Sequence, residues 1–445
     1  MRLLVGVTGF VVFFFFFFFL RGLATRSSRV LGSVSTACSN RRNNSIHRCR
    51  DVTNRVCRGV ETLLAWCTGS WTVLAVSAAD QQNQPTGAGG DRDHYVDLLR
   101  VGALGVVVLW HLVLTIPWWS ADGPHVSNVV APHLWLWPLT WITPMPLFFI
   151  AGGWANGRAL ADGTRSGAFL RRRCSRLLRP ALPLVAVAAA AWIAAGLLDD
   201  PRPARTAIKL GSSHLWFLGV YIAVTLLAPL THRLARGRLW PVPFLVLLAA
   251  AAAGDVGRFA GDGTPLSLFN MVTAWAVVHQ TGYHFDWLRA HRRAARAIAA
   301  TAAGVAAFLC LVGPYAWPMV GVPGGGPSNL GPATVALACV GVFQGAFAAV
   351  LEPVLARRAR ILRTVRRLAS WSMPVYMWHL PAYVAVLGAW ALVGLPMPRT
   401  DALVWWLTRP VVVLASIAVA AALISVARAR PSSGSKQTTV TSDRE

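Results

Sequence analysis

The feature that most constrains this chain is a series of apolar segments of about twenty residues, separated by short polar or basic stretches. A helix needs about twenty apolar residues to cross the hydrocarbon layer of a bilayer. Only 13% of the 445 residues are charged, about half the share in a soluble globular protein. The sequence therefore predicts an all-α integral membrane protein, a bundle of about ten transmembrane helices. The expected spans are roughly 97–117, 134–155, 180–198, 213–231, 239–254, 266–282, 295–317, 331–351, 370–392 and 402–426.

The two ends of the chain differ from this core. Residues 1–90 contain a run of seven consecutive Phe residues and then a stretch rich in Arg, Ser and Asn. We interpret them as an atypical N-terminal extension, either a signal or anchor segment or the result of a mis-assigned start, and expect part of it to be disordered. The membrane domain is expected at 95–427, and 428–445 is expected to be a disordered cytoplasmic tail.

The net charge of +25 is explained by membrane topology. One set of alternate loops carries twenty Lys and Arg residues, whereas the opposite set carries five, mixed with Asp residues. Because Lys and Arg are retained on the cytoplasmic side, the bias predicts a multi-pass protein with both ends of its core in the cytoplasm. The lipid bilayer is an expected partner of the chain, and no nucleic acid is expected.

Several kinds of site have no support in the sequence. The seven cysteines are scattered, and no pattern with the spacing of a Cys/His metal site occurs, so neither a disulfide framework nor a bound metal is expected. The chain also lacks the GxSxG pattern of a serine esterase and a Gly-rich phosphate loop. A soluble hydrolase or nucleotide-hydrolysing enzyme is thus not indicated.

The first expected span contains three ionisable residues, Asp97, Arg100 and His111. Arg100 and His111 are eleven residues apart, which in a helix is about 20° from three full turns and a rise of about 16 Å. Asp97 falls on the same face. Ionisable groups in a span are costly and often functional, and a neutral imidazole can move a proton near pH 7. The simpler alternatives are a topology-setting charge for Arg100 and a structural hydrogen bond for His111.

Further polar or small residues stand out in the other expected spans. Gly152, Gly153 and Gly157 would permit a close helix approach or a break in the second span. The stretch FLRRRCSRLLRP presents cations on one helix face, which would bind a polyanion such as the phosphates of coenzyme A, although cytoplasmic retention alone would also explain them. For three further clusters, structural hydrogen bonding is the better single explanation: His214 with Trp216, His279 with Gln280 and His284, and Tyr376 with His379.

In order and spacing, these motifs resemble those of the membrane-bound acyltransferase 3 family of bacterial O-acyltransferases. Arg100 and His111 match its Arg-x10-His signature, and DLLR matches its Asp-x-x-Arg. PLFFIAGGWANGR is similar to its Phe-Phe-x-x-(Ser/Gly)-Gly segment, and RRRCSRLLRP to its Arg-x-x-Arg motif in either of two registers. SHLWFL and VYMWHLP are similar to its Trp-Phe-Leu and Tyr-x-x-His segments. Because Ala151 precedes Gly152 and Gly153, in place of the common Ser-Gly, no serine nucleophile is expected there.

The resemblance, which covers about 95–427, implies an enzyme of the bacterial plasma membrane. It would move an acyl group, often acetyl, from cytoplasmic acyl-CoA to a hydroxyl of a sugar, glycolipid, polysaccharide or small metabolite. His111 would act as the general base on the acceptor or otherwise take part in the transfer. Arg100 and Asp97 would be the other catalytic residues, with Arg100 also engaging the acyl-CoA. Arg173, Arg176 and Arg179 would bind the acyl-CoA, and the expected substrate contacts are Trp216, His279, Tyr376 and His379.

Two other functions are compatible with these residues. A transporter or exporter of an envelope component or metabolite could use buried His and Arg residues as a proton relay. It would be expected to show an inverted repeat, whereas the two halves of this core have unlike motifs. A scaffold in an envelope-assembly complex would need the polar groups only for structure.

Overall fold

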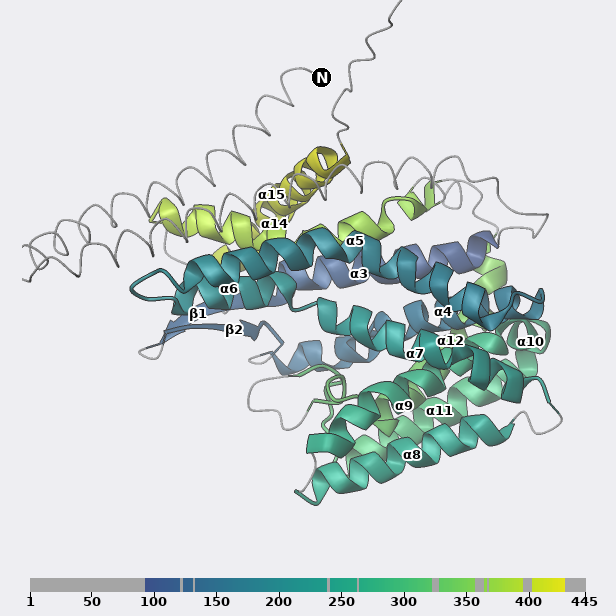
Figure 1. The fold of residues 1–445 in the computed structure, drawn as a ribbon. Helices are drawn as coiled ribbons and strands as arrows, with labels where there is room; N and C mark the ends of the chain where they lie inside the picture. The colour runs from purple at the N-terminus through teal and green to yellow at the C-terminus, as the bar shows by residue number, and fades with distance from the viewer. Residues whose placement is uncertain are drawn as a thin grey trace, which may run out of the picture. The chain divides into compact units, whose positions relative to one another are not determined.

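The structure is a computed structural model that describes residues 93–120, 123–130, 133–237, 241–261, 264–321, 328–356, 364–365, 368–394 and 402–428. The expectations for residues 1–90 and for the tail from residue 429 lie outside the described residues. Residues 90–420 form one compact unit, and the candidate site lies entirely within it. Figure 1 shows the course of the chain.

Helices make up most of the described chain. In chain order they are α3 (His94–Leu114), η1 (Leu134–Ile142), α4 (Met145–Ala161), α5 (Ser166–Ala195), α6 (Arg202–Ser212), α7 (Leu215–Ala235), α8 (Pro241–Phe259), α9 (Thr264–Tyr283), α10 (Phe285–Ala290), α11 (Arg292–Val312), α12 (Val335–Ala356), α14 (Ser372–Leu392) and α15 (Leu403–Arg428). The strands β1 (Thr115–Ser120) and β2 (Gly123–Asn128) form an antiparallel hairpin.

Eight helical segments of the described chain are long and apolar enough to cross a membrane. They contain α3, α5, α6 with α7, α8, α11, α12, α14 and α15. The predicted class, an all-α multi-span membrane protein, is confirmed, and ten is an approximate count. The expected spans 134–155 and 266–282, where α4 and α9 lie, are not among the eight.

The expected second span is interrupted in the structure. Residues 134–142 form the 3-10 helix η1, and α4 begins only at Met145. Thr143 between them has a ψ of 124°, outside the helical range, because the following Pro144 disfavours a helical residue before it. Pro144 and Pro146 then stand at the start of α4, where a missing backbone N–H costs no helical hydrogen bond.

Two further elements were not predicted from the sequence. The first span was expected to reach residue 117, but α3 ends at Leu114 and Thr115 opens β1, since Pro117 lacks the backbone N–H that a longer helix needs. The hairpin pairs Thr115 with Asn128. The amphipathic helix α6, expected to be a loop, packs against α5, α14 and β2 (Figure 1).

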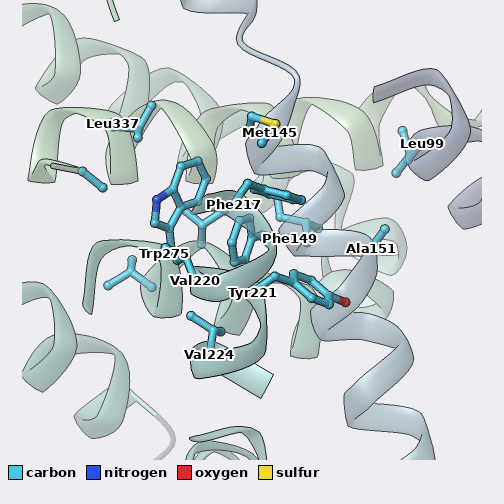
Figure 2. Packing of buried hydrophobic residues seen from close by; sticks show 14 of the residues in the cluster. Leu99, Met145, Phe149, Ala151, Phe217, Val220, Tyr221, Val224, Trp275 and Leu337 are labelled. Carbon is cyan, nitrogen blue, oxygen red and sulfur yellow. The ribbon is translucent and has the colours of Figure 1, made fainter. Parts of the chain in front are cut away.

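The bundle core is built from aromatic side chains of α4, α7 and α9. Phe149 stacks on Trp275 at 4.5 Å between ring centroids, and Phe217 and Tyr221 of α7 meet Phe149 edge to face. Figure 2 shows these rings beside Met145 and Leu337. Such ring pairs add to the stability gained from burying the aromatic surface, and they fix the positions of three helices around the site.

Two glycines let α4 and α9 approach closely. A Cβ added to Gly153 would overlap the carbonyl oxygen of His279, and one added to Gly282 would overlap the carbonyl oxygen of Ile150. The close approach expected at Gly153 is therefore present. Helices associate in lipid through such small residues because backbones can then make direct van der Waals contact.

An ionic cluster fastens the end of the bundle that lies away from the hairpin. Arg289 of α10 bonds to Asp93 at 2.5 Å and to Glu352 of α12. The other oxygen of Asp93 accepts the backbone N–H groups of Tyr95 and Val96, and so caps α3. The hydrogen bond from Arg289 to Glu352 raises the pKa of Arg289 above its usual value, so the cluster stabilises the cation. The start of α3 is thereby joined to α10 and α12.

Candidate functional site

His111 stands in the last turn of α3 and lines a cavity of about 580 Å³. The cavity lies at the hairpin end of the bundle. Its other walls come from the hairpin, from the start of α4, from α6, from the start of α7, from α14 and from the segment between α11 and α12. Asn128 of the hairpin donates a hydrogen bond of 2.7 Å to the carbonyl of Gly321, which joins two of these walls.

Helix α14 supplies a partner for His111. The Nδ1 atom of His111 lies 2.9 Å from the Nε2 atom of His379. The Nδ1 atom of His379 lies 2.7 Å from the backbone carbonyl oxygen of Tyr376, three residues earlier in the same helix. His379 is only 2% exposed and is not among the residues that line the cavity. It was expected to contact substrate, but the structure places it behind His111.

Another histidine, His214 at the start of α7, lines the cavity together with His111. His214 is 3% exposed. Its ring nitrogens make no hydrogen bond of full geometry within the described chain, and the backbone group that acts on the ring belongs to Met377. The backbone carbonyl of His214 accepts a 2.7 Å hydrogen bond from the Tyr376 hydroxyl, so α7 and α14 are held together here. Tyr376 itself lines the cavity, as does Trp216.

His214 was undervalued by sequence reasoning. The segment SSHLWFL contains both His214 and Trp216, and only Trp216 was expected to contact substrate. Both line the cavity. A buried polar ring without a hydrogen bond of full geometry costs free energy, so the histidine is the better candidate for a hydrogen bond to a bound molecule. Its position at the start of a span, in an otherwise apolar context, was the available signal.

Asp97 and Arg100 lie far from this cavity. They form an ion pair of 3.0 Å within α3, and the helical rise between Arg100 and His111 is about 16 Å. The three ionisable residues thus lie on one helix, as predicted, but belong to two separate regions of the structure. Asp97 and Arg100 do not line the cavity around His111.

A second polar group surrounds Arg100. Arg173 of α5 donates a 3.0 Å hydrogen bond to the carbonyl of Ala155 in α4, and both Arg100 and Arg173 lie within electrostatic reach of the Tyr221 hydroxyl. His279 is buried beside them and pairs with Asn156 at 3.1 Å. His279 therefore belongs to this region and not to the cavity. Arg176 and Arg179 are exposed on α5.

Within the described residues, no group of three His, Cys, Asp or Glu side chains is placed to hold a metal ion. The cavity offers imidazole, hydroxyl and amide groups among aromatic rings, a combination suited to binding an organic hydroxyl compound and moving its proton.

Comparison with known protein families agrees with this chemistry. The family model described as an acyltransferase domain, acyltransferase 3, matches residues 93–425. No curated protein and no solved structure matches the chain. The matched region contains every residue of the cavity and of the polar group around Arg100. The chain belongs to the acyltransferase 3 family and is a membrane-embedded enzyme that transfers acyl groups.

Proposed function

We propose that this enzyme transfers an acyl group, acetyl in the simplest case, from acyl-CoA to a hydroxyl group bound in the cavity, with His111 as the general base. The observation that carries the proposal is the position of His111. It lines the cavity, and its Nδ1 atom is occupied by His379. The Nε2 atom is therefore the nitrogen left to accept a proton from a bound hydroxyl.

The transfer step balances with this one base. His111 removes the hydroxyl proton, and the acceptor oxygen attacks the thioester carbonyl of the donor. The carbon–sulfur bond breaks, and His111 returns the proton to the departing thiolate. The products are an ester and free coenzyme A. Acid–base catalysis of this kind contributes roughly 10²–10⁴-fold to a rate.

The donor is assigned to the region around Arg100 and Arg173. Both are cations, and the exposed Arg176 and Arg179 extend the positive surface along α5. Guanidinium groups bind phosphates through paired hydrogen bonds, and coenzyme A carries phosphates at the end remote from its thiol. A donor anchored at Arg100 would reach His111 along α3, a rise of about 16 Å. The bias of basic loops puts this end in the cytoplasm of a bacterial cell.

The acceptor is an uncharged hydroxyl compound with some apolar surface. Among the described residues that line the cavity there is no Asp, Glu, Lys or Arg. Trp110, Trp216 and Phe217 offer apolar faces, and Asn128 and Ser213 add hydrogen-bonding groups. A sugar, a glycolipid head or a hydroxylated metabolite fits this lining, and the bias of basic loops supports a cavity on the side opposite the cytoplasm.

Mass spectrometry of the cell's glycolipids, polysaccharides and secreted metabolites tests this function. Cells with the enzyme are compared with cells that lack it and with cells that carry His111→Ala. We expect one product to become lighter by one acyl group in both deficient strains. If the deficient strains instead retained the acylated product inside the cell, an exporter would be indicated and acyl transfer refuted.

A further inference from the structure

His379 is a buried group whose two ring nitrogens are both engaged. One contacts the carbonyl oxygen of Tyr376 at 2.7 Å and the other contacts His111 at 2.9 Å. The ring is 2% exposed and does not line the cavity. It cannot act on a substrate directly, so any part it plays in the reaction must pass through His111.

The contact with the carbonyl fixes the tautomer of His379. A carbonyl oxygen has no hydrogen to donate, so the Nδ1 atom of His379 must carry the proton of this hydrogen bond. In the neutral ring the Nε2 atom is then a lone pair that can only accept. The hydrogen bond to His111 is therefore donated by the Nδ1–H of His111.

The tautomer of His379 in turn fixes the tautomer of His111. With its proton on Nδ1, a neutral His111 has a lone pair on Nε2, the form required of a base that faces the cavity. After Nε2 accepts a proton, the Nδ1–H of the resulting cation is still donated to His379, and this hydrogen bond becomes charge-assisted and stronger. The interaction thus favours the charged form of His111 that the transfer step creates.

We propose that His379 is a positioning residue that holds His111 in its Nδ1–H tautomer and so keeps Nε2 available as the base. This inference rests on the proposed function of His111. A partner that orients a catalytic imidazole plays the same part in other enzymes, where it is commonly a carboxylate or a backbone carbonyl. Here His379 plays this part, and its own tautomer is fixed by its hydrogen bond to the backbone carbonyl of Tyr376.

His214 and Tyr376 are the other titratable side chains against this pair. The ring of His214 lies 5.1 Å from that of His379 between centroids, and the ring of Tyr376 lies 5.8 Å away. The hydroxyl of Tyr376 donates a hydrogen bond to the backbone carbonyl of His214, and the His214 ring interacts with the backbone of Met377. Neither side chain takes over the contact with His111 Nδ1.

Ring-nitrogen NMR of protein containing isotope-labelled histidine tests the inference without any turnover. The His111 signals are assigned by their loss in His111→Gln. We expect wild-type His111 to have a protonated Nδ1 and an unprotonated Nε2, and we expect His379→Leu to give a mixture of the two tautomers. A wild-type ring with its proton on Nε2 would overturn the proposal.

Kinetics of the purified enzyme supply the second test. For His379→Leu we expect kcat to fall by at least about 100-fold, with the acceptor KM changed by less than about threefold, because only the orientation of the base is lost. His379→Gln keeps a donor and an acceptor in its amide, so its kcat should be at least about tenfold higher than that of His379→Leu. His291→Gln, on an exposed histidine outside the site, is the matched control.

The two proposals fail in different ways. Full activity in a His111 variant would refute the general base and the role of His379 with it. A need for His111 together with normal kcat in His379→Leu would refute the positioning role alone. A loss of kcat in His379→Leu that His379→Gln does not relieve would also refute it, because a hydrogen-bonding amide should then have helped.

Discussion

Replacing Gly153 by Ala tests the close crossing of α4 and α9. The added Cβ would overlap the carbonyl oxygen of His279 and would lie 3.0 Å from its carbonyl carbon and 3.3 Å from the Cα of Gly282. All three are backbone atoms, so no side chain can rotate away. The helices must separate, or one of them must bend.

The expected cost follows from the cost of overpacking. Extra methylene groups in a packed interior destabilise by about 1–3 kcal/mol, and the lower backbone entropy of unfolded Ala returns about 0.4–1 kcal/mol. The net loss should be about 1.3 kcal/mol at the middle of both ranges and up to about 2.6 kcal/mol. Because 1 kcal/mol corresponds to about 2–4 °C in a domain of 150–250 residues, the apparent Tm should fall by a few degrees.

Thermal unfolding in detergent, followed by tryptophan fluorescence, measures this change. Gly105→Ala is the matched control, since it substitutes a helical glycine of α3 whose added Cβ meets nothing within 4 Å. We expect Gly105→Ala to keep or slightly raise the Tm, because there the reduced unfolded-state entropy acts alone. Equal Tm values for the two variants would refute the reasoning about the crossing.

Three further substitutions should lower the unfolding temperature. Arg289→Ala leaves the carboxylates of Asp93 and Glu352 without their cation and should lower the free energy of unfolding by about 3 kcal/mol. Arg289→Lys should restore part of this stability. An unchanged Tm in Arg289→Ala would argue against a stabilising role of the cluster. Tyr383→Phe removes a buried 2.7 Å hydrogen bond to a backbone carbonyl and should cost about 1 kcal/mol, which denaturation of the two forms side by side would detect. Both oxygens of Asp255 accept hydrogen bonds, one from Asn270 and the other from the backbone N–H of Val335. Asp255→Asn turns an NH2 group toward one of these donors in either orientation and should cost about 1–3 kcal/mol; wild-type stability would contradict that role.

Sequence reasoning was most successful within single helices. The apolar segments predicted the spans because the thickness of the bilayer sets their length. The helical repeat put Arg100 and His111 on one face because that relation depends only on residues within one helix. The splitting of residues 134–155 and the hairpin after α3 were not predicted. A proline can end a helix, but which structure follows it depends on the neighbouring elements that the chain packs against.

Relations between helices were beyond the reach of the single sequence. His111 and His379 are 268 residues apart, and nothing in either segment indicates that α3 and α14 are neighbours. For the same reason His379 was expected to contact substrate, although it lies behind His111, and His279 was grouped with it, although it lies beside Arg173. The separation of the site into a region around Arg100 and a cavity around His111 became visible only with the packing of the bundle.

The transfer rate of His111→Ala tests the central claim most directly. Purified wild-type and variant enzymes are supplied with acetyl-CoA and the acceptor identified by mass spectrometry, and membrane insertion and Tm are measured on the same samples. If His111 is the base, kcat should fall by about 10²–10⁴-fold, while insertion and Tm stay close to those of the wild type. Transfer at the wild-type rate by a correctly inserted His111→Ala enzyme would contradict the account.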